Sequence, residues 1–330
     1  MTGREALSEE EALAATSVII PVKDDIKLAQ CLESIDEDVE VVFALNGASD
    51  EVREIVKNCR HRHTVAEIPE ANIGAAYNIG AQVASGRFLL FMDSDCTFRP
   101  GTIRLMAREV VEHPVVKGQC VFTDGKGWSS KVIRRAREFQ TSDHSNAYSP
   151  PLIYDVRILP RIGGYHYSDL IHFQEDREFD FRLQLAGIPV RLRTEAVIHH
   201  AEQTGAADLR SGYRYGLGEA IGRELGLFVT PSPWWRLADD ARSIAEVFRV
   251  KGAAPALYRV AWLGMYNLGT CVHTLFDPFK VRPRYPARAR RIRNRGGVPV
   301  HSTKLDASYR DALRKSHERQ GRRITPSDSV

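Results

Sequence analysis

Phe88-Leu89-Leu90-Phe91-Met92-Asp93-Ser94-Asp95 is an apolar run that ends in two carboxylates separated by one residue. A short apolar run, preceded here by Ser85-Gly86-Arg87, predicts a fully buried strand. Ligands of open α/β sheets bind beyond the carboxyl ends of the strands, so acids at this place face a crevice. Two carboxylates there suit a hard divalent cation, which prefers oxygen ligands. The alternative is a strand that ends in an ordinary Asp-Ser turn, because both residues are common in turns.

Strand and helix patterns alternate on both sides of this run. Upstream, the sequence predicts strands at residues 17–22, 39–45 and 63–68, and helices at 25–35, 51–59 and 72–84. Downstream, it predicts helices at 97–113, 132–139 and 177–186, and strands at 115–123, 190–192 and 196–198. Alternation at this spacing indicates βαβ units and an α/β fold with a mostly parallel sheet flanked by helices.

The chain becomes helical beyond residue 225, with helices predicted at residues 237–250 and 253–276. The last helix carries one apolar stripe, made of Leu257, Val260, Ala261, Met265, Leu268 and Leu275. This stripe either packs against the rest of the chain or contacts an anionic membrane surface together with the arginine-rich tail from Arg282. The tail lacks the aromatic interleaving of nucleic-acid-binding segments, so no nucleic-acid partner is expected.

Composition places the chain among soluble globular proteins. Of its 330 residues, 43% are hydrophobic and 27% are charged, and the net charge is +4. The five cysteines, at positions 31, 59, 96, 120 and 271, are scattered without a Cys-x-x-Cys pair, which favours a reducing compartment over a disulfide framework or zinc site. The acidic start lacks the features of a secretory signal. We therefore expect a cytoplasmic protein, with peripheral contact at the inner face of the membrane as a further possibility.

Several segments, taken in order, resemble the family 2 glycosyltransferases, whose members have the GT-A fold. They are Ser17–Pro21, Asn46–Asp50, Asn72-Ile73-Gly74 with Asn78 and Gly80, Gly86–Asp95, Gly163-Gly164-Tyr165, and Glu175-Asp176 with Arg182 and Ala186-Gly187. The resemblance covers roughly the first two-thirds of the chain. It implies a GT-A domain at residues 17–225, with a nucleotide-sugar half at 17–100 and an acceptor half at 101–225. Residues 1–16 precede it, and a helical extension at 226–280 and a basic, partly disordered tail at 281–330 follow.

The resemblance also implies an inverting, metal-dependent hexosyltransferase. Its donor would be a nucleotide-diphosphate sugar, UDP-linked or other, and its acceptor a hydroxyl of a lipid carrier, glycan, peptide or small metabolite. Asp93 and Asp95 would hold the diphosphate and Mg²⁺ or Mn²⁺, and one of His199 and His200 would complete the metal site. Asp176, with Glu175 beside it, would take the proton of the acceptor hydroxyl.

Further residues are assigned to the two substrates by the same resemblance. The donor pocket would include Pro21, Val22, Lys23, Asp24, Leu45, Asn46, Asn72, Gly74, Asn78 and Ser94, and the acceptor loop Gly163, Gly164 and Tyr165. Two positions depart from the family pattern. Leu45 stands where an acid usually binds the nucleobase, and Tyr77 stands where an arginine is common. The identity of the base is therefore left open.

Other interpretations compete with this one. Glu175 and Asp176 could form only a favourable first turn of a helix, and Glu178 and Asp180 are expected on its solvated face. A nucleotidyltransferase also places acids at strand ends, but it needs a glycine-rich loop after the first strand, and residues 21–25 contain no glycine. A binding protein with an impaired donor site would explain Leu45 and Tyr77. The presence of all four site acids argues against it; they are Asp93, Asp95, Glu175 and Asp176. A homo-oligomer is compatible with either interpretation.

Overall fold

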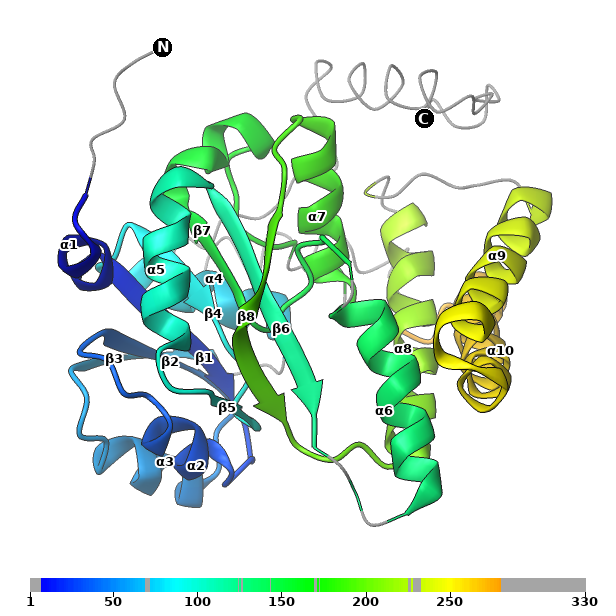
Figure 1. The fold of residues 1–330 in the computed structure, drawn as a ribbon, viewed down its shortest axis with the longest axis horizontal. Coiled ribbons are helices and arrows are strands. Elements are labelled where there is room, and N and C mark those ends of the chain that lie inside the picture. Colours follow the sequence, from blue (N-terminus) through cyan, green and yellow to red (C-terminus); the bar gives the residue numbers. More distant parts are fainter. Residues whose placement is uncertain are drawn as a thin grey trace.

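The computed structural model describes residues 7–68, 72–123, 125, 127–142, 144–168, 171, 173–224, 227 and 233–279. Within them, eight strands form one mixed sheet in the order β3-β2-β1-β4-β7-β6-β8-β5 (Figure 1). The strands are β1 (Thr16–Val22), β2 (Glu40–Asn46), β3 (His63–Ile68), β4 (Phe88–Phe91), β5 (Cys96–Phe98), β6 (Val115–Phe122), β7 (Leu152–Asp155) and β8 (Arg191–His200). The basic tail predicted at residues 281–330 lies outside the described residues.

Helices cover both faces of this sheet. They are α1 (Glu9–Ala14), α2 (Leu28–Glu33), α3 (Asp50–Lys57), α4 (Ile73–Val83), α5 (Thr102–Glu112), α6 (Trp128–Thr141), the 3₁₀ helix η1 (Val156–Ile162), α7 (Glu175–Leu185), α8 (Gly205–Glu224), α9 (Pro233–Lys251) and α10 (Ala253–Phe276). Side chains of a strand alternate between faces, so Val18 and Ile20 of β1 join the core under α2, α3 and α5. Ile19 between them joins the core on the opposite face, with residues of α4 and α7.

The direction of the strands agrees with the predicted α/β class. Among the pairs that the structure describes, β1 with β2, β2 with β3, β1 with β4 and β6 with β8 are parallel. The pairs β4 with β7, β6 with β7 and β5 with β8 are antiparallel. The fold is therefore a mostly parallel sheet whose second half is mixed.

One predicted helix and two predicted strands differ from the structure. The helix predicted from residue 97 begins at Thr102, because residues 96–98 form β5 against the end of β8. The two short strands predicted at 190–192 and 196–198 are one strand, β8, whose pairing with β6 is irregular between Gly118 and Gln119. A local irregularity hides the continuity of a strand from its sequence pattern, since it interrupts the period of two.

The last three helices stand together beside α6 (Figure 1). Helix α8, which the sequence pattern did not predict, packs along α10 at two glycines. A Cβ at Gly216 would overlap the carbonyl oxygen of Tyr266, and one at Gly269 would overlap that of Tyr213. Glycine is required here because the two backbones touch. No helix in the described part of the chain combines the length and the apolar character needed to cross a membrane.

Candidate active site

A cavity of about 380 Å³ opens at the carboxyl ends of β1, β2 and β4. This is where open α/β sheets bind ligands. Its lining residues are Pro21, Val22, Lys23, Asp24, Asp25, Asn46, Ile73, Tyr77, Asp93, Ser94, Asp95, Ser149, Phe173, Glu175, Asp176 and Tyr215. The cavity therefore brings the Asp-x-Asp segment and the Glu-Asp pair, far apart in sequence, to one site.

Asp93, Asp95, Cys96 and His200 form a cluster beside this cavity. One potential ligand atom from each lies within 4.8 Å of the others. The ladder between β5 and β8 builds the cluster, because it pairs Cys96 with His200 and lets the Ala201 amide donate to the Asp95 carbonyl at 3.2 Å. The His200 Nε2 consequently lies 3.7 Å from the Asp95 Oδ1.

His200, and not His199, belongs to the cluster. Neighbouring residues of a strand point to opposite faces, and His199 is exposed whereas His200 is part-buried. The Nδ1 of His200 lies 2.8 Å from the Ala201 carbonyl oxygen, which can only accept a hydrogen bond. In the neutral ring the proton therefore sits on Nδ1, and Nε2 presents its lone pair toward Asp95.

Two carboxylates in a part-buried place repel each other. Burial and then the charge of Asp95 raise the pKa of Asp93 to about 6, whereas His200 and the Tyr77 hydroxyl lower it. Tyr77 orients Asp93 by donating to its Oδ1 at 2.9 Å. Burial also raises the pKa of the Cys96 thiol well above its usual range, so this group stays protonated. Without Cys96, the cluster offers carboxylate oxygens of Asp93 and Asp95 and one imidazole nitrogen of His200. This ligand set fits Mg²⁺ or Mn²⁺.

Glu175 and Asp176 form the first turn of α7 and differ in protonation. Glu175 is 8% exposed, and burial together with the neighbouring Asp176 charge raises its pKa to about 8. Burial also raises the pKa of Asp176, to about 6, while the Arg177 amide and Lys117 lower it. At neutral pH the proton therefore sits on Glu175 and Asp176 is the ionised partner. The Oε2 of Glu175 has no hydrogen-bond partner among the described residues.

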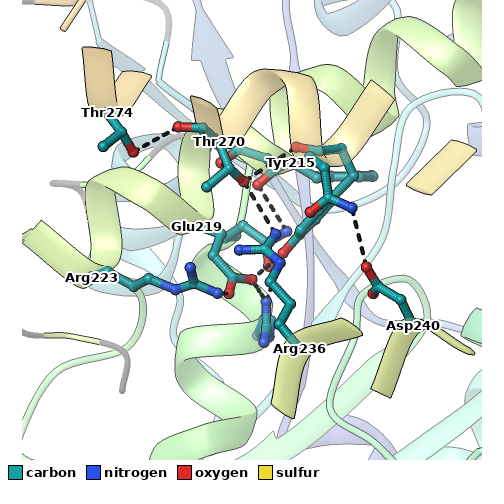
Figure 2. A network of polar contacts seen from close by, with 12 residues as sticks. Tyr215, Glu219, Arg223, Arg236, Asp240, Thr270 and Thr274 are labelled. Atoms are coloured by element: carbon teal, nitrogen blue, oxygen red, sulfur yellow. Dashed lines mark hydrogen bonds and ion pairs between the residues drawn. The ribbon is translucent and has the colours of Figure 1, made fainter. Parts of the chain in front are cut away.

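The C-terminal helices hold the start of α7 in place. The Arg177 guanidinium pairs with Glu219 of α8 and receives support from Tyr266 of α10, whose hydroxyl lies 2.9 Å away. The same Glu219 pairs with Arg223, and Figure 2 shows the side chains of Glu219 and Arg223 pointing toward each other. The Arg177 amide donates to the Asp176 Oδ1 at 2.6 Å. The network thus ties the backbone beside Asp176 to both helices.

Ten of the predicted site residues line the cavity. They are Pro21, Val22, Lys23, Asp24, Asn46, Asp93, Ser94, Asp95, Glu175 and Asp176, and His200 adjoins them through Asp95. The residues that the prediction missed are Asp25, Ile73, Tyr77, Ser149, Phe173 and Tyr215. Tyr215 comes from α8, for which no sequence pattern pointed to the site. Phe173, two residues before Glu175, has an unusual φ of 66°.

Four residues predicted for the donor pocket do not line the cavity. Leu45 is 3% exposed and belongs to the core, because it points to the face of β2 opposite from its neighbours. The Asn72 side chain caps α4, and the backbone N–H of Asn72 donates to the Asn46 Oδ1 at 2.9 Å. Asn72 therefore orients Asn46, which lines the cavity. Gly74 is buried in the first turn of α4. Asn78 is fully buried and bonds the backbone of Tyr167 at 2.8 and 2.9 Å.

The predicted acceptor loop also lies away from the cavity lining. Gly163 and Gly164 adopt φ values of 97° and 79°, which glycine tolerates best. The Tyr165 hydroxyl donates to the Glu178 Oε1 at 2.6 Å in the interior. The expectation that Glu178 and Asp180 lie on a solvated face is wrong. Both are buried, since Glu178 pairs with the buried Arg182 and Asp180 accepts from the Ala147 amide at 2.8 Å.

Comparison with known proteins agrees with this geometry. Residues 17–163, from β1 to the end of η1, match the family described as Glycosyl transferase family 2. That region of the chain is therefore similar to this family. A stretch of 107 residues is 30% identical to an uncharacterized glycosyltransferase of Rickettsia bellii, and covers 30% of this chain and 16% of that protein. A stretch of 105 residues is 30% identical to glycosyltransferase GlyA of Streptococcus pneumoniae, and covers 29% of this chain and 15% of GlyA.

The fold of the chain is similar to that of a solved glycosyltransferase. The mannosyltransferase PcManGT of Pyrobaculum calidifontis, in complex with GDP-Man and Mn²⁺, superposes with a TM-score of 0.53 over 80% of this chain and 88% of that one. The two sequences are 17% identical. This likeness confirms the predicted GT-A fold class.

Proposed function

We propose that the chain is an inverting glycosyltransferase that moves a sugar from a nucleoside-diphosphate sugar to an acceptor hydroxyl. The observation that supports this most is the convergence of two acidic pairs on one cavity. Asp93 and Asp95 follow β4, and Glu175 and Asp176 open α7. The first pair suits the leaving diphosphate with its cation, and the second suits the acceptor.

The residues that would hold the cation are Asp93, Asp95 and His200. A divalent ion bound there would neutralise the charge that develops on the leaving diphosphate. The protein positions its ligands beforehand, since Tyr77 fixes Asp93 and the Ala201 carbonyl fixes the ring of His200. Held in this way, the carboxylates lose little freedom when the donor binds.

Asp176 would act as the general base. As the acceptor oxygen forms its bond to the anomeric carbon, its proton moves to the Asp176 carboxylate. The bond between that carbon and the diphosphate oxygen breaks, and its electron pair leaves with the diphosphate. Because this is a single displacement, the configuration at the anomeric carbon inverts. One carboxyl oxygen of protonated Glu175 has no partner in the described part of the chain, and this group would hydrogen-bond a substrate hydroxyl beside the base.

A panel of nucleoside-diphosphate sugars with different bases, assayed with Mn²⁺, with Mg²⁺ and with a chelator, tests the proposal. We expect one donor to be hydrolysed slowly and transferred on addition of acceptors, with release of the nucleoside diphosphate. Asp95→Ala should abolish the metal-dependent turnover, whereas Asp239→Ala, at an exposed site of α9, should not. Unchanged turnover in Asp95→Ala would refute the metal assignment. In a parallel assay with nucleoside triphosphates and sugar 1-phosphates, release of pyrophosphate would indicate a nucleotidyltransferase instead.

A further inference from the structure

The outer face of α10 has no charged side chain. Its exposed residues are Ala253, Leu257, Val260, Ala261, Gly264, Leu268, Cys271, Thr274, Leu275 and Phe276. Leu257, Leu275 and Phe276 are 72%, 71% and 74% exposed. A helix on the surface of a protein normally turns polar residues to water, and an apolar surface of this extent marks an interaction site. We call these ten residues the outer face of α10.

The polar residues of α10 point inward instead. Tyr258 donates to Asp208 of α8 at 2.6 Å, and the buried His273 lies 3.1 Å from Glu224 of the same helix. The Arg259 guanidinium stacks over Trp262 at 4.7 Å and bonds Ser243 of α9 at 3.2 Å. Helix α10 therefore turns these polar side chains, together with the buried Ala256, Trp262 and Leu263, toward its neighbours, and its outer face is apolar as well.

The sequence after α10 indicates what covers this face. Residues 282–295 contain seven arginines and no acid, and they begin six residues after Phe276. This segment is a poor apolar cover for the helix. A second copy of the chain would carry the same positive charge after α10, whereas an anionic lipid surface is complementary to that charge. An apolar helix face beside a polybasic segment matches the two signals that anchor a protein to anionic lipid.

We propose that the outer face of α10 docks on an anionic phospholipid surface, and that the positive charge of the sequence after the helix favours anionic over neutral head groups. The helix lies along the surface, because its opposite side is occupied by α8 and α9. This inference does not depend on the proposed reaction, since it rests on α10 and the segment after it. Lipid binding is measured without a donor or acceptor. A negative result for lipid binding therefore does not affect the proposed reaction, and a negative result for the reaction does not affect lipid binding.

Cys271 provides a probe at the centre of this face. It is exposed, whereas Cys31, Cys96 and Cys120 are buried and Cys59 is half-buried. An environment-sensitive fluorophore on Cys271 in a Cys59→Ser background should shift to the blue with phosphatidylcholine vesicles that contain phosphatidylglycerol. It should not shift with phosphatidylcholine alone, and salt should weaken the effect. A fluorophore at Lys57→Cys on α3, with Cys271 and Cys59 replaced by serine, should stay unchanged.

Flotation of the full chain with the same vesicles separates this face from other exposed apolar residues. Leu257→Glu with Leu268→Glu should lower the bound fraction by about tenfold or more, because the charges oppose burial in lipid. The matched pair Leu237→Glu with Phe248→Glu, on α9, should bind as the unchanged protein does. Equal binding of the α10 variant would overturn the proposal.

A dimer would be the competing explanation of the apolar face. Sedimentation without lipid measures it. A concentration-dependent dimer that Leu257→Glu with Leu268→Glu dissociates, together with an unshifted Cys271 fluorophore in anionic vesicles, would replace the lipid surface by a second copy of the chain. Circular dichroism checks that the variant is folded, and the fluorophore experiment decides the question independently of it.

Discussion

At the scale of single residues, Asp176 and Glu175 are neighbours whose surroundings give them different states. In Asp176→Asn the amide cannot accept the proton of the acceptor, so we expect transfer to fall by about 10²–10⁴-fold. Donor binding should stay within a fewfold, because Asp93 and Asp95 are untouched. Isothermal titration with the donor and an initial-rate assay measure the two effects. Asp239→Asn is the control, and a variant that retained transfer would rule out Asp176 as the base.

The same pair sets the expected pH dependence. Burial raises the pKa of Asp176 to about 6, and the base acts ionised, so kcat should rise with pH through that value. The pKa of Glu175 is raised to about 8, and loss of its proton removes a hydrogen-bond donor, so kcat should fall above that pH. Glu175→Gln should remove the alkaline limb only. If the alkaline limb persisted in that variant, the role of Glu175 as a proton-bearing neighbour would be wrong.

The sequence could predict that a residue lines the cavity where the end of a strand or helix fixed its position. Asp93 and Asp95 follow the end of a buried strand. A residue at that end lies beside the cavity, whichever side of the sheet its side chain points to. Leu45 and His199 lie inside strands, where the outcome depends on which face points to the site. That choice is made by long-range packing, so a single sequence leaves it open.

At the scale of elements, the contact between α8 and α10 depends on two glycines. Gly216→Ala places a Cβ against the Tyr266 carbonyl, which cannot move without separating the helices. We expect a loss of about 1–3 kcal/mol in the free energy of unfolding. Gly264→Ala, on the outer face of α10 with nothing within 4 Å, should instead stabilise by about 0.5–1 kcal/mol. Urea denaturation of both variants measures the difference, and equal effects would show that the helices are not in close contact.

The helical extension was also the least predictable set of elements. The apolar stripe of α10 is clear in the sequence and predicts the helix. The sequence does not show which side of α10 faces the protein, because both sides carry apolar residues and the polar ones lie on the packed side. The structure is needed to show that polar contacts contribute to this interface. Among them are the contacts of α10 with Asp208 and Glu224 of α8 and with Asp240 of α9.

At the scale of the whole molecule, α8 and α10 connect the proposed lipid surface to the cavity. Tyr215 of α8 lines the cavity, and Glu219 of the same helix holds Arg177 beside the proposed base. On the other side of this pair of helices lies the outer face of α10. A chain docked by that face would carry its cavity at a fixed distance from the lipid head groups, which suits an acceptor bound to the membrane.

The free energy of unfolding of the whole chain should depend on the protonation of the buried pair Glu175 and Asp176. A carboxyl whose pKa is raised by folding binds protons more tightly in the folded state, so it stabilises the fold at low pH and this contribution is lost as pH rises. For Glu175 and Asp176 the loss should occur between about pH 4 and pH 8. Glu175→Gln with Asp176→Asn removes both charges. The double variant should therefore be more stable than the unchanged protein by several kcal/mol at pH 8, and equally stable near pH 4.

Thermal and urea denaturation in the presence of a chelator measure this difference, since a bound cation would stabilise the folded state of both proteins. Asp239→Asn, on the surface of α9, should follow the unchanged protein at every pH. A double variant that is no more stable at pH 8 would mean that the pair is solvated rather than buried. Asp176 would then titrate as an ordinary carboxyl, and the acidic limb of kcat would have to move below about pH 5.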